Sequence, residues 1–264
     1  MMRLYLGMPK IKGPSILCLG IFDGVHIGHR AIINCALKLR EKELSPVIIY
    51  TFDQRPAEVL RNAPADLLSS HFQKARILTR MGVDAMCIDR FDQQTAQIEP
   101  EDWLKNLCES FHPEHIYTGY NYSFGRLGRG NNQLLKEMEE VYGYQSHVMP
   151  EIVNAAQDVS STRIRNKILD GDIVNANFLL TYPYTMILRF QKEVAGKLCF
   201  DWTGKNVKPP AGKYSILLKY RRAGETKSIR TVLYIEDKPY IKRRRASLSL
   251  QTNEKAAISF AHRL

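Results

Sequence analysis

The sequence has no long hydrophobic run and few cysteines. No stretch approaches the roughly 20 apolar residues that cross a bilayer, and residues 1–9 have no apolar core of the kind that a signal peptide needs. The cysteines are scattered, with no CxxC motif and no Cys/His cluster, at Cys18, Cys35, Cys87, Cys108 and Cys199. These absences argue against a transmembrane segment and a structural zinc site, and they predict a cytoplasmic protein with reduced thiols.

Acidic residues are scarce in the C-terminal part of the chain. Residues 183–264 carry 18 Lys and Arg against 6 Asp and Glu, a net charge of +12, whereas residues 1–182 hold 20 against 21. This excess, densest at residues 242–245, is compatible with a surface for nucleic acid or an acidic partner. It is equally compatible with a basic domain that attracts anionic substrates. A strand edge protected from pairing by charge is the favoured interpretation, so a nucleic-acid partner is not predicted.

Residues 1–182 alternate short apolar runs with amphipathic stretches. Strands are predicted at residues 16–21, 47–52, 84–88, 115–119 and 144–149, and helices near residues 29–43, 72–81, 101–110 and 131–142. Two more helices are predicted, one with Ser160 or Ser161 as its N-cap and one with Asp172. This alternation predicts an α/β fold, a Rossmann-like parallel sheet with ligands at the carboxyl ends of its strands.

The pattern changes after residue 182. Runs rich in β-branched and aromatic residues occur at residues 185–190, 214–220, 228–235, 246–250 and 257–260, separated by turn clusters. No helix of ordinary length fits this region. The sequence therefore predicts two domains, a nucleotidylyltransferase-type domain at residues 1–183 and a small antiparallel β-barrel or sheet at residues 184–264.

The strongest chemical signal is GIFDGVHIGH at residues 20–29, between the first predicted strand and the first predicted helix. Glycine lets the backbone approach a nucleotide closely, and a helix N-terminus offers free N–H groups to phosphate oxygens. His26 and His29, three residues apart, are placed to stabilise charge on an α-phosphate and a leaving pyrophosphate. The alternatives are a glycine-rich turn with incidental histidines, or a zinc site, which would need a third ligand.

Three further segments point to the same chemistry. VSSTRIR at residues 159–165 combines hydroxyl groups, backbone N–H groups and guanidinium groups at a helix start, although an ordinary N-cap with solvated arginines would look the same. TGYNYSFGRLGRG at residues 118–130 suggests a loop around a flat ligand, or a mobile surface loop. TFDQRP at residues 51–56 ends the second predicted strand and would face the ligand crevice.

Together these motifs resemble the bacterial bifunctional riboflavin kinase/FAD synthetase family of the HIGH-motif nucleotidylyltransferase superfamily. The resemblance covers residues 15–184 and includes VSSTRIRNKILDGDIVNANFLLTYPY, which is similar to the family's passage from transferase to kinase domain. It implies an FMN adenylyltransferase, with ATP and FMN as substrates, FAD and pyrophosphate as products, and Mg²⁺ carried on the ATP phosphates without a direct protein ligand.

The resemblance also implies roles for individual residues. The catalytic residues would be His26, His29 and Arg165, and the flavin would lie near Phe52, Asn121 and Phe124. The implied ATP-binding residues are Gly20, Phe22, Asp23, Gly24, His26, Gly28, His29, Ser161, Thr162 and Arg165.

The sequence departs from the family in two places. Gln54-Arg55 stands where the family usually has Pro-His, and Asn121 stands where it often has Asp. The Gly-x-Pro-Thr-x-Asn signature of the kinase module is absent, and the nearest stretch is FDWTGKN at residues 200–206. The four glutamates of residues 184–264 stand in no recognisable kinase context, so we expect a barrel without riboflavin kinase activity.

Three alternatives remain open on the sequence. The first is the complete bifunctional enzyme. The second is a nucleotidylyltransferase of another specificity, against which the loop at residues 118–130 argues. The third is a non-enzymatic, RNA-binding regulator, against which the intact His26, His29 and Arg165 argue. The oligomeric state cannot be predicted.

Overall fold

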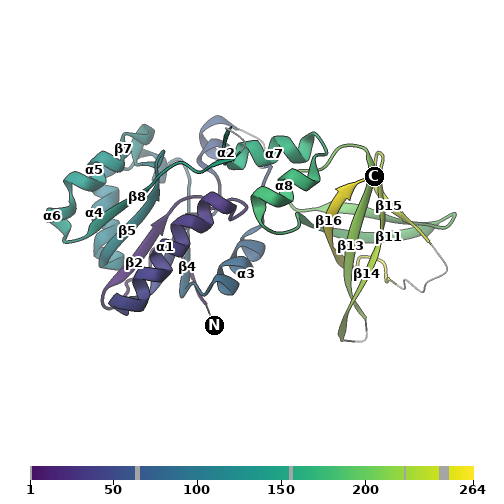
Figure 1. Cartoon of the computed structure of the whole chain (residues 1–264), viewed down its shortest axis with the longest axis horizontal. Helices are drawn as coiled ribbons and strands as arrows, with labels where there is room; N and C mark the ends of the chain where they lie inside the picture. Colours follow the sequence, from purple (N-terminus) through teal and green to yellow (C-terminus); the bar gives the residue numbers. More distant parts are fainter. Residues whose placement is uncertain (1, 63–65, 155–156, 223, 244–249) are drawn as a thin grey trace. The chain divides into compact units, whose positions relative to one another are not determined.

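The computed structural model describes residues 2–62, 66–154, 157–222, 224–243 and 250–264, which form two compact units (Figure 1). The first unit contains Met1–Ala65 and His71–Val159, and the second contains Asp66–Ser70 and Ser160–Leu264. The division between compact units thus falls after Val159, not at the domain boundary predicted at residues 183/184. The reason is that the two helices after Val159 pack with the barrel.

The first unit is built on a six-stranded sheet in the order β1-β4-β3-β2-β5-β8, in which every neighbouring pair is parallel. Its strands are β1 (Arg3–Leu6), β2 (Ser15–Leu19), β3 (Val47–Phe52), β4 (Ala85–Asp89), β5 (Pro113–Gly119) and β8 (Gln145–Met149). The predicted Rossmann-like parallel sheet is confirmed. Strand β1 was not predicted.

Helices cover both faces of this sheet, because its strands are apolar on both sides. Ile16 and Cys18 of β2 face the cluster that contains α1 (Ile27–Glu43) and α3 (His71–Met81). Leu17 and Leu19 face the cluster that contains α4 (Pro100–Phe111) and α5 (Asn132–Glu137), and Figure 1 shows α1 and α4 on these separate layers.

The single helix predicted near residues 131–142 is two short helices. It divides at Met138, whose ψ of 2° departs from helical geometry. The remaining short elements of the first unit are α2 (Pro56–Arg61), η1 (Thr95–Gln97), β6 (Ser123–Phe124), η2 (Arg126–Gly128), β7 (Gly130–Asn131), α6 (Glu139–Tyr142), β9 (Val153–Asn154) and β10 (Gln157–Asp158).

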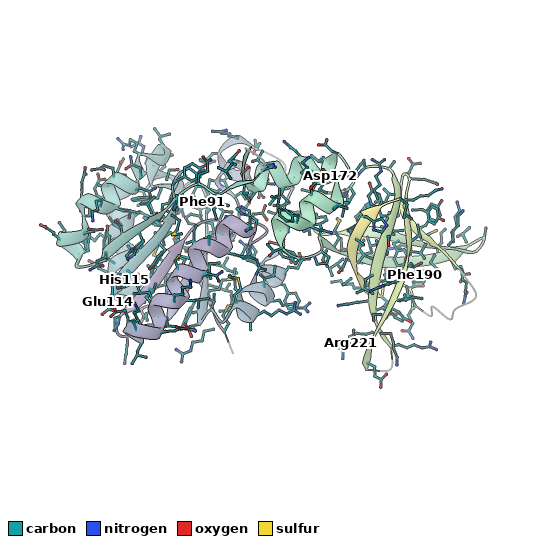
Figure 2. All side chains as sticks on the ribbon, viewed as in Figure 1. Phe91, Glu114, His115, Asp172, Phe190 and Arg221 are labelled. Carbon is teal, nitrogen blue, oxygen red and sulfur yellow. The ribbon has the colours of Figure 1, made fainter. Side chains whose placement is uncertain are left out.

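The second unit begins with α7 (Ser161–Leu169) and α8 (Ile173–Leu180), and both predicted N-caps are confirmed. The Ser160 hydroxyl accepts the Arg163 N–H at 3.2 Å, and the Asp172 carboxylate, labelled between the two helices in Figure 2, accepts the Asn175 N–H at 3.3 Å. The Asn177 side chain joins α8 to the barrel, since its amide donates to the Phe260 carbonyl at 2.9 Å.

Six antiparallel strands close into a barrel in the order β11-β12-β15-β14-β13-β16. They are β11 (Thr185–Val194), β12 (Lys197–Thr203), β13 (Gly212–Arg222), β14 (Glu225–Ile235), β15 (Pro239–Lys242) and β16 (Lys255–Arg263). Strands β12 and β15 were not predicted. Of the strand predicted at residues 246–250, residues 246–249 lie outside the described residues, and Leu250 is not in a strand.

The pairing of the barrel strands bears on the interpretation of the basic C-terminal region as an edge protected by charge. A strand that is paired on both sides has no free edge that charge must protect. Lys242 belongs to β15, which pairs with both β12 and β14. Lys242 pairs with Lys197 of β12, whereas Lys227 and Arg230 lie in the part of β14 that pairs with β13 alone, so edge protection stays a prediction there.

A short segment, Asp66–Ser70, interrupts the sequence of the first unit but belongs to the second unit. Leu67 bridges Asn206, its N–H donates to the Lys205 carbonyl at 2.8 Å, and its carbonyl accepts the Val207 N–H at 3.0 Å. This pairing of distant segments was not predicted. No helix among the described residues is long and apolar enough to cross a membrane.

Candidate functional site

The predicted motif residues of the first unit lie at the topological switch point of the sheet. From β2 the chain proceeds to β3 on one side, whereas β5 lies on the other side of β2 and leads to β8. The loops that follow β2 and β5 therefore leave the carboxyl ends of adjacent strands in opposite directions. Such a point is where open α/β sheets bind their ligands.

The turn after β2 has an unusual backbone. Phe22 and Val25 have left-handed φ values of 49° and 39°, and Gly24 has a φ of 82°. Left-handed geometry is costly for a β-branched or aromatic residue. Both side chains are fully buried in the core, and the Val25 N–H donates to the Phe22 carbonyl at 3.1 Å. Packing therefore holds this turn in a shape that its residues disfavour.

The turn brings two histidines face to face. The His26 and His29 rings stack, with their centroids 3.7 Å apart and their planes inclined by 23°. The centroid of the Phe22 ring lies 5.1 Å from that of His29. Burial first, and then the neighbouring His26 and Lys74, lower the pKa of His29 well below its usual value. Its ring is therefore neutral at pH 7 and carries one N–H that can donate to an anion.

Gly28 gives the histidine pair its space. A Cβ atom at this position would lie 3.2 Å from two atoms of the His26 ring and 3.8 Å from the Val159 carbonyl oxygen. Such contacts would push the ring from its stacked position. The absence of a side chain at Gly28 therefore leaves room for the His26 ring.

The N-terminus of α1 is suited to an anion. His26 is its N-cap and supplies no side-chain capping bond, and the first turn contains no acidic residue. The N–H groups of a helix's first turn lack partners within the helix and carry the positive end of the helix dipole. Phosphate oxygens are the usual ligands of such an end.

A buried lysine lies beneath the turn. Lys74 of α3 is 3% exposed, and its ammonium donates to the Ile21 carbonyl at 2.6 Å and to the Thr51 hydroxyl at 3.3 Å. Thr51 donates to the same carbonyl at 2.9 Å. Burial lowers the Lys74 pKa to about 8, although the Asp23 carboxylate acts to raise it. Lys74 was not predicted from the sequence, but its spacing of four from the buried Leu78 places it on the inner face of α3.

Asn132 holds the loop after β5. It too was not predicted from the sequence. Its amide donates to the Gly119 and Tyr120 carbonyls, both at 2.9 Å, and its carbonyl oxygen accepts the Thr118 hydroxyl at 2.8 Å. The predicted flavin residues of this loop differ in exposure. Asn121 is exposed, whereas Phe124 is buried against Trp103, with ring centroids 4.8 Å apart.

The end of β3 contributes an aromatic surface. Phe52 is half-buried and packs edge-on against Tyr50 and Phe91, with ring centroids at 5.5 and 4.9 Å. Figure 2 labels Phe91 at the carboxyl end of the sheet. Arg55, which departs from the family pattern, forms an ion pair with Glu58 at 3.1 Å. This partner offsets the charge that Arg55 brings to the side expected to hold the flavin.

The other predicted ATP residues lie in the second unit. Ser161, Thr162 and Arg165 occupy the first two turns of α7, where Ser161 and Arg165 are half-buried and Thr162 is exposed. The Arg165 Nε donates to the Asp66 carbonyl at 2.8 Å. The structure thus gathers His26, Gly28 and His29 in one unit, and the hydroxyls and guanidinium of VSSTRIR in the other.

Two other features of the first unit lie apart from these residues. A cavity of about 610 Å³ contains Trp103, Asp89 and Lys10 in its lining, but none of the residues predicted to bind ATP or flavin. His115 Nδ1 and His147 Nε2 are 3.0 Å apart, and Figure 2 shows His115 towards the amino end of β5. Ligands are not expected at that end of a parallel sheet.

The fold and the switch-point turn define a class, the Rossmann-like nucleotidylyltransferase domain followed by a small β-barrel. The sequence pattern of the family described as FAD synthetase matches residues 8–163, more than half of the chain. The chain belongs to this family.

Relatives bear two kinds of name. A bifunctional riboflavin kinase/FMN adenylyltransferase of Listeria monocytogenes is 33% identical over 65% of this chain and 55% of its own length. An FAD synthetase of the same organism is 29% identical over 66% of this chain and 72% of its own length. The chain thus matches only about half the length of the bifunctional relative.

The likeness to a solved structure extends through both units. A crystal structure described as a macrolide-efflux protein from Streptococcus pneumoniae has a TM-score of 0.88 over the whole of this chain and 91% of its own, at 20% identity. At this identity the likeness shows the fold alone. The fold of a Rossmann-like domain plus barrel is therefore one that a known protein shares.

Proposed function

We propose that the protein is an FMN adenylyltransferase, which transfers AMP from ATP to FMN and releases FAD and pyrophosphate. The observation that carries the proposal is the stacked His26–His29 pair at the N-terminus of α1, at the switch point of the sheet. The membership in the FAD synthetase family supports the choice of substrates.

The chemistry follows from the site. The FMN phosphate is an anionic nucleophile already, so the reaction needs no general base, only alignment with the α-phosphorus and stabilisation of charge. His26 and His29 would donate to oxygens of the α-phosphate and the leaving pyrophosphate. The N–H groups at the start of α1 would hold further phosphate oxygens. The bond to the pyrophosphate breaks as the bond from the FMN phosphate forms.

Magnesium fits this scheme as a companion of the phosphates. Mg²⁺ usually keeps several waters and binds through substrate phosphates with one or two carboxylates at most. In the described part of the chain, no three His, Cys, Asp or Glu side chains gather to hold a metal. The proposal accordingly places Mg²⁺ on the ATP phosphates, where it would offset their charge.

The remaining ligand contacts are assigned from the family resemblance. Ser161, Thr162 and Arg165 would bind the β- and γ-phosphates. Phe52 and Asn121 have exposed surface that would contact a flavin. Phe124 is only 6% exposed, so its main role would be to support the loop.

The barrel is proposed to lack riboflavin kinase activity. All four of its glutamates have partners: Glu193 pairs with Arg243, Glu225 with Lys227, Glu236 with the Tyr240 hydroxyl and Glu254 with the Gln251 N–H. The Thr203 hydroxyl, in the stretch closest to the kinase signature, donates to the Ile187 carbonyl at 2.6 Å. These contacts are ordinary packing and surface interactions, and the proposal that the barrel lacks kinase activity rests on the absence of the Gly-x-Pro-Thr-x-Asn signature from the sequence.

The test is an assay of the purified full chain with ATP and Mg²⁺, supplied with either FMN or riboflavin. FMN should yield FAD and pyrophosphate in equal amounts, and riboflavin should yield no FMN. No FAD from FMN would overturn the proposal. FMN from riboflavin would show that the protein is bifunctional.

A further inference from the structure

Lys74 is the buried cation nearest the histidine turn, and neither the motifs nor the family resemblance gives it a role. It belongs to α3, outside the four chemistry-bearing segments of the sequence. Burying an ammonium group is expensive unless its hydrogen bonds and charge are compensated. The side chain is nevertheless 3% exposed, and it reaches the carboxyl ends of β2 and β3.

The contacts of Lys74 converge on one backbone group. Its ammonium and the Thr51 hydroxyl both donate to the Ile21 carbonyl, at 2.6 and 2.9 Å. Ile21 immediately precedes Phe22, whose φ of 49° begins the strained turn. A carbonyl held by two donors cannot rotate freely, so these bonds fix the orientation of the peptide that enters the turn.

The turn is also electrostatically coupled to this lysine. Asp23 lies in the turn and interacts with the Lys74 ammonium, and the ammonium in turn acts on His29. The Lys74 charge disfavours protonation of His29 and favours anions nearby. It therefore supplies fixed positive charge at a site where negative charge develops.

We propose that Lys74 is a positioning residue for adenylyl transfer, which orients the histidine turn through the Ile21 carbonyl and places a fixed positive charge beneath it. The inference rests on the proposed function for its kinetic effects. The hydrogen bonds and the coupling to His29 exist without any substrate.

The electrostatic surroundings of Lys74 make a pH test possible. The titratable groups that interact with it are Asp23 in the turn, His29 on α1 and His71 on its own helix, and His71 in turn interacts with Asp53 after β3. Burial is the main cause that lowers the pKa of both histidines, so neither changes charge at alkaline pH. Lys74, with a pKa of about 8, does lose its charge there, because an ammonium deprotonates as the pH rises through its pKa.

The experiment compares the wild type with Lys74→Met, Lys74→Arg and the control Arg80→Met, an exposed residue of the same helix. Lys74→Met should lower kcat about 100-fold, the scale of a small misplacement of catalytic groups, in protein that circular dichroism shows to be folded. The kcat/KM for ATP of the wild type should fall above about pH 8. Lys74→Arg should lack this alkaline limb, and Arg80→Met should behave as the wild type.

Two outcomes would overturn the inference: a kcat of Lys74→Met within about threefold of the wild type, or an unchanged alkaline limb in Lys74→Arg. If Lys74→Met does not fold, the arginine variant decides. If the wild type makes no FAD, the proposed function fails separately. The role of Lys74 is then tested by NMR titration of the His29 ring without substrate. Lys74→Met should raise the His29 pKa, and Lys74→Arg should preserve it. An unshifted His29 pKa in a folded Lys74→Met would reject the role.

Discussion

The two units of the molecule bury different kinds of side chain. In the first, Asp23, His26 and Lys74 are all at most 5% exposed and lie within or beneath one turn. In the barrel, the buried side chains of the described strands are apolar or aromatic, and its glutamates bond with partners at the surface. Buried charge lowers stability unless it is compensated, so it is retained where function requires it.

The histidine turn of the first unit is arranged for a reaction, whereas the barrel interior is arranged for packing. The strained Phe22–Val25 backbone belongs to the first unit, and its cost is offset by burial of the same two side chains. The barrel interior is filled by residues such as Phe190, Phe200 and Phe260. Substitutions in the histidine turn should therefore change rates, and those in the barrel interior should change stability.

The largest expected effect is on the histidines. His29→Ala, and separately His26→Ala, should lower kcat about 1000-fold, the upper range for loss of one donor to a transition-state oxyanion. The measurement is the rate of FAD formation at saturating ATP and FMN. His262→Ala, which alters an exposed histidine of the barrel, is the matched control. A loss of less than tenfold in both site variants would remove the histidines from the mechanism.

The next largest effect should be a loss of stability in the barrel. Phe200→Ala removes a fully buried ring that packs edge-on against Phe190 at 5.6 Å. It should lower the free energy of unfolding of the second unit by about 3 kcal/mol, from lost burial and the cavity that remains. Denaturant unfolding followed by circular dichroism measures this. Phe178→Ala, at a side chain that is 59% exposed, should cost far less. Equal losses would refute the comparison.

Gly28→Ala should lower the reaction rate without lowering the thermal stability of the first unit. The added methyl group would meet the His26 ring at 3.2 Å and displace it, so kcat should fall about 30-fold. Alanine is the better helix former, so the melting temperature should not fall. The pair of measurements is the rate of FAD formation and thermal unfolding. Wild-type activity with a lowered melting temperature would contradict the role given to this glycine.

The smallest effect concerns acid stability away from the site. Burial acts to raise the pKa of Glu139, but hydrogen bonds from Lys136 and Ser146 prevail and hold it at about 2. A lowered carboxylate pKa stabilises the fold above its unfolded pKa, and this contribution disappears as the pH falls from about 4.5 towards 2. Glu139→Gln should therefore cost about 1 kcal/mol at pH 7, because the exposed Lys136 is screened by solvent, and nothing near pH 2.

Urea unfolding of Glu139→Gln at several pH values checks this, with the exposed Glu140→Gln as control. A pH-independent difference from the wild type would show that Glu139 acts through packing and not through its charge.

Much of the first unit could be predicted from sequence, because hydrophobic periodicity and N-caps are local signals. Ser160 or Ser161 was predicted to cap one helix and Asp172 the next, and Ser160 and Asp172 are the caps. The order of strands around β2 and the pairing of Leu67 with Asn206 could not be predicted, since they depend on contacts between distant segments. Strands β1 and β15 contain only 4 residues each, too few to establish a period.

The candidate site divides in the same way. His26, Gly28 and His29 were found because their spacing is compact and their chemistry is distinctive. Lys74 was missed because a lysine in a helical pattern is ordinarily solvent-exposed, and only its neighbours in space show its burial. Asn132 was missed because its three hydrogen bonds reach back across the loop after β5.

The protein is proposed to transfer AMP to FMN at the site around the histidine turn, and its barrel strands are proposed to phosphorylate no flavin. The most direct test gives the protein riboflavin and FMN together, with ATP labelled at either the α- or the γ-phosphorus, and follows the label into the flavin fraction. The expected result is α-label in FAD and no γ-label in any flavin. Absence of α-label from FAD, or γ-label in FMN, would contradict it.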